Sequence, residues 1–327
     1  MTLVARHAAL SDIGLHRATN EDSFTAGGSL YVVADGMGGA QAGEVASQLA
    51  VETVVEQVGA GADLLEAAAQ ANQRIHLLAI DSPARKGMGT TLTALSISGD
   101  RGVAIHIGDS RLYRQRDSLL EQLSDDHSMV GQWLREGTIT PEEAAVSRYR
   151  SVLTRALGTE AEAQVDRFEV DLRLGDRLLL CSDGLCSLVP ADIIGSILAQ
   201  GSPEVVAREL VREAKNRGGY DNVTVVVLRL EAAGDVAPDD VAPDDEVAGD
   251  EPPAEAGTPS PSTAPAVPAG IVVAPAAAAR SRRRRHSMIV AVIITALIAA
   301  ALLLLLAFDR LPVGDVLLGL SNTRARL

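Results

Sequence analysis

The chain has 327 residues and a formal net charge of −14 at pH 7, with 43 acidic residues against 29 lysines and arginines. This balance argues against a nucleic-acid-binding protein, which would need a basic face. The two cysteines, Cys181 and Cys186, are not spaced as C-x-x-C, so they predict neither a zinc site nor a redox motif. We expect two small buried hydrophobic residues in a reducing compartment.

Short apolar runs and amphipathic segments alternate up to residue 230. Apolar or alternating runs predict strands over 4–12, 30–34, 90–98, 101–107, 111–116, 164–171, 177–181 and 223–230. Helical periodicity predicts helices over 41–58, 63–80, 125–136, 141–146, 191–199 and 203–216. For the third helix, Ser124 or Asp126 is the expected N-cap. Runs of strands with helices in pairs favour an α+β fold, a four-layer α-β-β-α sandwich of two antiparallel sheets flanked by helices.

Three aspartates lie at the ends of the most apolar of these runs. Asp35 follows the run 30–34, Asp183 follows 178–181 after one serine, and Asp221 comes just before 223–227. Strands this apolar are buried, so their ends are expected to converge on one edge of a core. Carboxylates brought together repel one another unless a cation holds them, and hard oxygen ligands select Mg²⁺ or Mn²⁺. The sequence therefore predicts a divalent-metal hydrolase, although an Asp-Gly pair taken alone is also a common turn.

Further charged or glycine-rich blocks accompany the three aspartates. In chain order they are R-x-x-N-E-D at 17–22, V-A-D-G-M-G-G at 33–39, G-E-x-A-S at 43–47, G-M-G-T-T-L at 87–92, G-D-S-R at 108–111, L-L-L-C-S-D-G-L at 178–185 and D-N-V-T-V-V-V at 221–227. This ordered set covers residues 1–230. It resembles the PPM/PP2C family of metal-dependent Ser/Thr protein phosphatases, and most closely its membrane-anchored bacterial members.

The resemblance implies a binuclear Mn²⁺ or Mg²⁺ centre. Asp35 would bridge the two ions, the Gly36 carbonyl would bind the second, and Asp183 and Asp221 would hold the first. Two cations about 3.5–4 Å apart can clamp a phosphoryl group and activate a water molecule near neutral pH. That water would attack phosphorus in line, so the chemistry needs no phosphoenzyme.

The resemblance also implies roles for residues around this centre. Glu21 and Asp22 would lie behind the ligands, with Glu21 acting on a metal through water. Arg17 would bind the substrate phosphate through its planar fork of donors. Asp109, together with Asp183, would hold a third and weaker ion. Asn222 would orient its neighbours.

One feature departs from the family pattern. Some relatives carry a histidine just after the first Asp-Gly or the later glycine pair, but this chain has Met37 and Ala40 there. His16 and His127 lie near motifs in the sequence, yet a lone histidine is more often structural or exposed. The acid that protonates the leaving group is left unassigned.

Two other functions remain open on the sequence. A catalytically dead relative could act as a phosphoprotein-binding scaffold, but Asp35, Asp183 and Asp221 are all intact. A metal phosphatase for small phosphate esters would use the same site chemistry. A cysteine-dependent phosphatase is not favoured, because neither cysteine lies in a Cys-x5-Arg loop.

The remaining chain changes composition. Residues 231–279 are rich in Ala, Pro, Asp, Glu, Gly and Val, and with the arginine cluster that follows they predict a disordered linker over 231–287. Residues 288–308 are 21 residues without a charge, which predicts one transmembrane helix. Five arginines between 280 and 285 place residues 1–287 in the cytoplasm and the tail 309–327 outside it.

These features predict a single-pass protein of the cell membrane with a cytoplasmic catalytic domain. The expected partners are phosphorylated proteins, among them receptor-type Ser/Thr kinases and their substrates, and membrane lipid around the one helix. A tether of this kind would raise the effective concentration of the enzyme toward other membrane-bound proteins.

Overall fold

The computed structural model describes residues 3–233. The linker predicted over 231–287 lies almost wholly outside this range, and the predicted transmembrane helix and tail lie outside it entirely. No helix within the described range is long and apolar enough to cross a membrane.

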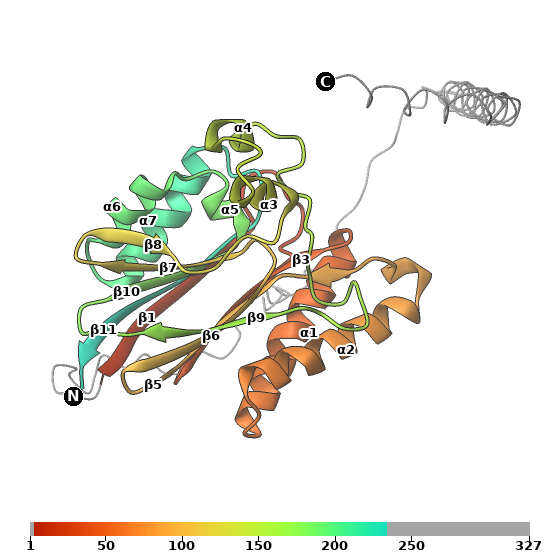
Figure 1. Cartoon of the computed structure of the whole chain (residues 1–327), viewed down its shortest axis with the longest axis horizontal. Helices are drawn as coiled ribbons and strands as arrows, with labels where there is room; N and C mark the ends of the chain where they lie inside the picture. The colour runs from red at the N-terminus through yellow and green to blue at the C-terminus, as the bar shows by residue number, and fades with distance from the viewer. Residues whose placement is uncertain (1–2, 234–327) are drawn as a thin grey trace, which may run out of the picture. The chain divides into compact units, whose positions relative to one another are not determined.

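Two antiparallel sheets lie face to face, and helices cover their outer faces (Figure 1). The first sheet has the order β1 (Leu3–Asp12), β11 (Val223–Ala232), β10 (Arg177–Cys181), β7 (Arg111–Arg116) and β8 (Leu119–Gln122). The second has the order β2 (Asp22–Gly27), β3 (Leu30–Met37), β5 (Leu92–Ser98), β6 (Arg101–Ile107) and β9 (Asp166–Asp171), and β4 (Gly89–Thr90) pairs with β3.

The helices divide between the two outer faces. Helices α1 (Ala40–Gly59) and α2 (Leu64–Ile80) cover the second sheet, and α6 (Ala191–Leu198) and α7 (Pro203–Asn216) cover the first. The others are short: the 3-10 turn η1 (Pro83–Arg85), α3 (Met129–Arg135), α4 (Pro141–Ala145) and α5 (Asp183–Cys186). This arrangement confirms the predicted sandwich of two antiparallel sheets flanked by helices.

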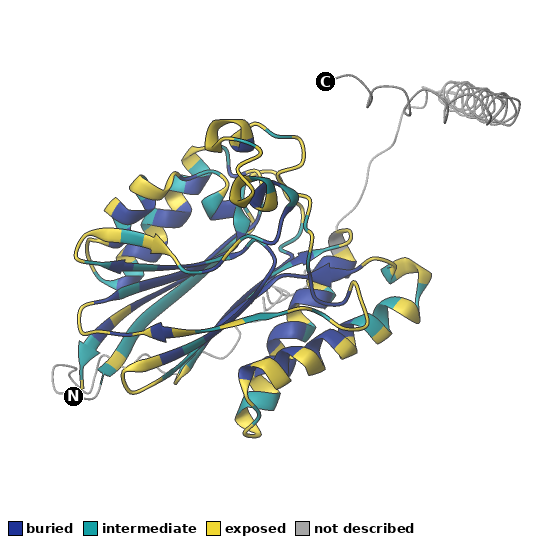
Figure 2. Cartoon of the chain, viewed as in Figure 1, coloured by how far each residue is buried: buried dark blue, intermediate teal, exposed yellow. Residues whose placement is uncertain are grey.

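Three hydrophobic layers hold the sandwich together. Val32 and Ile105 pack against α1 and α2, whereas Leu179 and Val225 pack against α6 and α7. Between the sheets lies a third layer that includes Tyr31, Val33, Leu178, Leu180 and Val226. Figure 2 shows the central strands almost wholly in the buried colour. Strands that are buried on both faces explain why their sequences read as continuous apolar runs.

Most predicted elements agree with the observed ones, but the 3-10 turn η1 was not predicted, and four other elements differ. Strands β2 and β8 and the short helix α5 were not predicted, because they are short and carry little periodic apolar pattern. The helix predicted over 125–136 begins only at Met129, so the N-cap prediction was wrong: Ser128 is the N-cap, and its hydroxyl accepts from Gly131 N. Asp125 and Asp126, which precede the helix, instead form hydrogen bonds to His106 of β6 and Arg111 of β7.

A buried histidine supports the end of β6. The His106 Nε2 faces the carbonyl oxygens of Gly108 and Asp125, at 3.1 and 3.0 Å, so this nitrogen carries the proton. Its Nδ1 then accepts from the Thr93 hydroxyl, at 2.9 Å. Burial lowers the pKa of His106 from 6.5 to about 4, so the ring is neutral at pH 7.

We expect His106 to make the protein less stable as the pH falls from 6.5 to 4. In this range the unfolded chain binds a proton that the folded chain does not bind, so the folded state loses free energy relative to the unfolded one. From pH 7 to 4.5 the loss should be about 2 kcal/mol.

Urea unfolding of wild type and His106→Gln, both with chelator present, measures this effect. The wild type should lose more stability over this pH range than the variant. An equal loss in both proteins would show that His106 is not protonated preferentially on unfolding.

Candidate active site

Five aspartates meet at one end of the sandwich. Asp35 belongs to β3, Asp22 opens β2, Asp109 follows β6, Asp183 opens α5 after β10, and Asp221 comes just before β11. Burial raises the pKa of Asp35 well above its usual range, and the charges of the other four raise it further. The carboxylates are therefore close in space, as the sequence predicted.

Asp35 and Asp183 form the centre of this group. Their carboxyl groups lie close together, so that a protonated Asp35 can donate to Asp183, and burial and the charge of Asp221 raise the pKa of Asp183 to about 6. Two carboxylates in direct contact must either share a proton or bind a cation. This contact is the clearest sign that the site fits a metal ion.

Asp22 joins the two sheets beside that contact. Its Oδ2 accepts from the Ser182 and Thr224 hydroxyls, each at 2.7 Å. Within residues 3–233 its buried Oδ1 has no hydrogen-bond partner, and burial raises the pKa of this carboxyl to about 7. An unsatisfied buried carboxylate oxygen suits a bound cation or an ordered water.

The backbone around Asp35 is held from both sides. The Thr91 hydroxyl accepts from Asp35 N at 2.9 Å, and the Thr90 hydroxyl and Thr91 N both donate to Asp35 O at 2.9 Å. A Cβ on Gly36 would collide with the carbonyl of Gly43, so only glycine fits there. These contacts explain the V-A-D-G and G-T-T motifs as parts of one backbone cradle.

Asn222 connects three segments behind the carboxylates. Its Oδ1 accepts from Glu21 N at 2.8 Å, and its Nδ2 donates to the carbonyls of Ile13 and Thr19, at 3.0 Å each. This network fixes the loop that carries Glu21 against the start of β11. Burial raises the pKa of Glu21, and the nearby Arg17 opposes that shift.

Arg17 lies at the mouth of the site, with 44% of its side chain exposed. Its Nη2 donates to Asp221 Oδ2 at 2.7 Å, and its Nη1 lies 3.9 Å from Glu21 Oε1. The bond to Asp221 is the main cause that raises the pKa of Arg17. A phosphate ligand would therefore have to share this guanidinium with Asp221.

His127 holds the turn that carries Asp109. The His127 N–H donates to Gly108 O at 2.7 Å, and its Nδ1 accepts from Gly108 N at 3.2 Å. Its Nε2 donates to Asp166 Oδ2 at 3.0 Å. This role could not be predicted from the sequence, because it depends on a contact between residues 19 positions apart.

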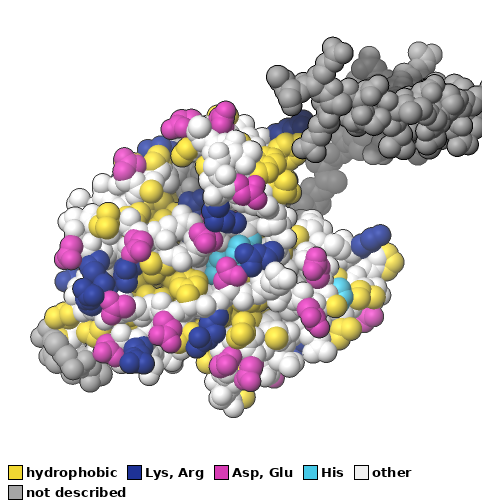
Figure 3. Space-filling model, in the orientation of Figure 1, with side chains coloured by type: hydrophobic (Ala, Val, Ile, Leu, Met, Phe, Trp, Pro, Cys, Tyr) yellow, Lys and Arg dark blue, Asp and Glu magenta, His cyan; other side chains and the backbone are white. Residues whose placement is uncertain are grey.

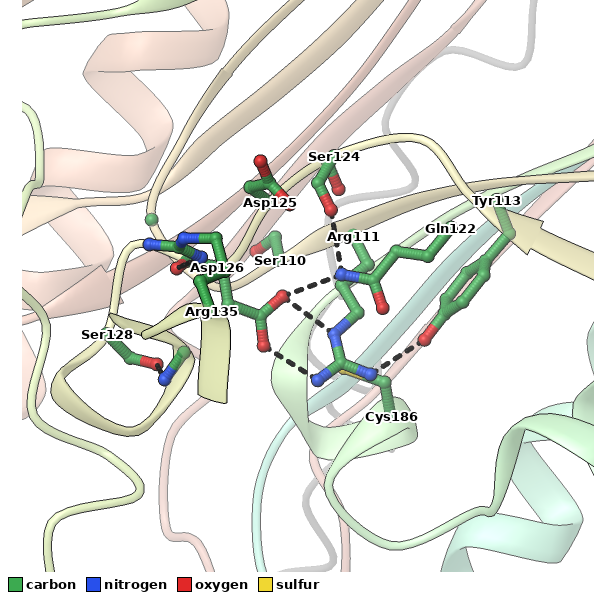
Figure 4. Close-up of polar contacts among 12 residues, drawn as sticks. Ser110, Arg111, Tyr113, Gln122, Ser124, Asp125, Asp126, Ser128, Arg135 and Cys186 are labelled. Atoms are coloured by element: carbon green, nitrogen blue, oxygen red, sulfur yellow. Dashed lines mark hydrogen bonds and ion pairs between the residues drawn. The ribbon is translucent and has the colours of Figure 1, made fainter. Parts of the chain in front are cut away.

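Arg111 of the G-D-S-R block anchors the segment that follows β8 (Figure 4). Its Nε and Nη2 donate to the two carboxylate oxygens of Asp126, at 2.9 and 2.7 Å. Its Nη1 donates to the Tyr113 hydroxyl at 2.8 Å. Arg135 closes the same segment by donating to Asp126 O at 2.9 Å. Arg111 is therefore held in place by contacts within the protein, and it lines the cavity next to the carboxylates.

A cavity of about 430 Å³ opens beside the carboxylates. Asp109, Asp183 and Asp221 line one side of it, and residues of α3 and α4, among them Leu134 and Ala144, line the other. Residues between 126 and 151 thus form part of the cavity wall, and the cavity gives a substrate room next to the carboxylates.

The donor set suits a hard divalent ion. The clustered side chains offer only carboxylate oxygens, which Mg²⁺ and Mn²⁺ prefer. In residues 3–233 no three His, Cys, Asp or Glu side chains already stand around one ion position. The reason is visible in the contacts: Asp221 is bonded to Arg17, and Asp22 Oδ2 is bonded to two hydroxyls. The carboxylate oxygens are suitable ligands for these ions. To bind them, Asp221 would have to release Arg17, and Asp22 would have to release its two hydroxyl partners if it used Oδ2.

Comparison with known proteins supports this interpretation. The protein phosphatase 2C family profile matches residues 16–224. The serine/threonine protein phosphatase PstP of Mycobacterium tuberculosis is 48% identical over 236 residues, which are 69% of this chain and 45% of that protein. The chain therefore spans less than half the length of this relative.

One further relative and one solved structure agree. The protein phosphatase PhpP of Streptococcus pneumoniae is 38% identical over 239 residues, covering 68% of this chain and 96% of that protein. The PstP catalytic domain, solved in complex with two manganese ions, superposes with a TM-score of 0.65 at 44% identity, covering 71% of this chain and all of that one. By sequence, by fold and by its carboxylate cluster, the chain belongs to the protein phosphatase 2C family.

Proposed function

We propose that this protein hydrolyses phosphoserine and phosphothreonine in other proteins at a binuclear Mn²⁺ or Mg²⁺ centre. The observation that carries the proposal is the close approach of Asp35 and Asp183, within a group of five aspartates that offers only oxygen ligands. The named phosphatases among its relatives support the same chemistry.

In this proposal Asp35, the Gly36 carbonyl, Asp183 and Asp221 hold the two ions. When bound, the ions would neutralise phosphoryl charge and lower the pKa of a water molecule. Asp109 would hold a third ion together with Asp183. The His127 clamp on Gly108 would fix the position of that carboxylate.

The residues behind the ligands would keep them in place. Asp22 would fix the two sheets through Ser182 and Thr224 and offer its free Oδ1 to a metal-bound water. Glu21 would likewise act on an ion through a water molecule. Arg17, at the mouth, would turn from Asp221 toward the substrate phosphate, where its fork of donors suits two oxygens.

We also propose that the enzyme works at the membrane. The uncharged run 288–308 and the arginines before it support one membrane-spanning helix with residues 1–287 in the cytoplasm. Its partners would then be phosphorylated proteins at the membrane, including Ser/Thr kinases and their substrates.

The first prediction from this proposed function concerns Asp183. Asp183→Asn should lower kcat for phosphate release from a phosphothreonine peptide by about two orders of magnitude or more, because a ligand charge is lost. The assay compares Mn²⁺, Mg²⁺ and chelator on the full chain. Asp81→Asn, on the exposed end of α2, is the matched control and should keep wild-type turnover. Wild-type turnover of Asp183→Asn at saturating Mn²⁺ would remove this residue from the metal site.

The second prediction concerns Arg17. Arg17→Ala should raise KM for the phosphopeptide roughly 10- to 100-fold, which is the loss of a charged hydrogen bond, and should change kcat much less. Arg17→Lys should recover part of the loss, and Arg212→Ala on the exposed face of α7 should have no effect. A large fall in kcat at unchanged KM would instead show that Arg17 serves the reaction through Asp221.

A further inference from the structure

Three arginines lie side by side across the first sheet, at the end opposite the aspartates. Arg6 of β1 pairs with Arg229 of β11, and Arg229 pairs with Arg177 of β10. The next residue in this row is Gln115 of β7, and the last is Leu120 of β8. We call Arg6, Arg229 and Arg177 the arginine row. Like charges directly opposite one another on neighbouring strands destabilise a sheet.

The arginine row faces the layer of α6 and α7. Two residues further along each strand, the corresponding row is apolar and packs beneath these helices; it consists of Ala8, Val227, Leu179 and Tyr113. The arginine row thus lies where the helical cover ends, next to the loop between α6 and α7. The Arg177 Nη1 donates to the Gly201 carbonyl in that loop at 3.0 Å.

Among the described residues, the acidic side chains on this face pair with the other two arginines of the row. Glu204 lies 3.9 Å from Arg6, and Glu231 lies 3.3 Å from Arg229. Within residues 3–233 Arg177 forms no ion pair; burial and the charge of Arg229 lower its pKa, and the charge of Glu231 opposes that shift. On the face drawn in Figure 3, by contrast, many basic side chains lie beside acidic ones. Arg177 is therefore placed to receive an anion from elsewhere.

A cavity adjoins the row and carries a second unsatisfied group. It has a volume of about 530 Å³, and small or apolar residues such as Leu120, Gly195 and Ala199 form part of its lining. Polar residues form the rest of the wall, among them Ser118, Asp192, Ser196 and Gln200. Gln115 also lines it, with only 7% of the residue exposed. Its Nε2 donates to Gly195 O at 2.9 Å, which fixes the amide, but its buried Oε1 has no hydrogen-bond partner among the described residues. The cavity therefore offers an acceptor for a backbone N–H.

We propose that residues 235–246 of this chain dock on Arg177 and in the adjoining cavity. These residues lie outside the described range and contain six carboxylates: Asp235, two in each of the repeats Val-Ala-Pro-Asp-Asp at 236–240 and 241–245, and Glu246. The Asp-Asp pair matches the charge of Arg177 and Arg229. The Val-Ala-Pro part matches the small apolar lining, and its N–H groups match Gln115 Oε1.

The length of the chain allows this docking. Strand β11 ends at Ala232, three residues beyond Arg229, and the described chain ends at Ala233. Seven extended residues, 233–239, reach about 23–25 Å. Turning back along three residues of β11 and crossing two strands to Gln115 needs about 20 Å. The first Asp-Asp pair can therefore reach the arginine row from its own chain.

Zero-length crosslinking on the full chain tests the proposal. A carbodiimide joins a lysine amine only to a carboxylate in contact with it, and the sequence has just two lysines, Lys86 and Lys215. In Arg177→Lys, the lysine introduced at position 177 keeps the charge of the row. It should become amide-linked to a carboxylate of 235–246, as identified by mass spectrometry. About 1 M NaCl, where the screening length falls to about 3 Å, should suppress the link.

Two controls make the result decisive. Lys215 lies 2.8 Å from Asp12, so their link should form in every sample and shows that the reaction works on folded protein. Arg101→Lys places a lysine at the same end of the other sheet and should form no link to 235–246. If the Lys215–Asp12 link forms but position 177 gives no link to 235–246, the proposal is wrong. Links found only between isotopically light and heavy copies would also overturn it, because the occupant would be a second copy.

Discussion

The structure depends on keeping several carboxylates buried and close together at one end of two sheets. Burial and mutual repulsion raise the pKa of Asp22, Asp35 and Asp183, so the folded chain must provide compensating contacts. It does so with neutral hydroxyls and backbone N–H groups more than with positive charge. Arg17, the cation that contacts this group most directly, lies at the exposed mouth. A divalent ion would remove the remaining repulsion.

This constraint explains why the motifs lie where the two sheets meet. Asp22 comes from the second sheet, whereas its hydroxyl partners Ser182 and Thr224 belong to the first. Asn222 likewise joins the start of β11 to the loop before β2. The carboxylates are therefore positioned only when both sheets are packed together. The apolar layer between the sheets thereby becomes part of the site.

The long strands and helices could be predicted, because buried apolar runs and helical periodicity are properties of local sequence. The convergence of Asp35, Asp183 and Asp221 followed from the same runs. Local sequence could not predict β2 and β8, or the true start of α3, because tertiary contacts decide them. The contact of His127 with Gly108 and the Arg17–Asp221 bond each join residues that are far apart in the sequence. No local sequence pattern predicts them.

The first sheet carries opposite charges at its two ends. Strand β10 runs from Arg177 to Cys181, just before Asp183, and β11 begins after Asp221 and passes through Arg229 near its end. Between these ends both faces of the strands are apolar and tightly packed. The carboxylates at one end are therefore separated from the arginines at the other end by a buried, largely apolar layer. Residues 235–246 could therefore dock at the arginine row without changing the geometry of the carboxylate cluster. Mutations could then alter this docking and the hydrolysis independently.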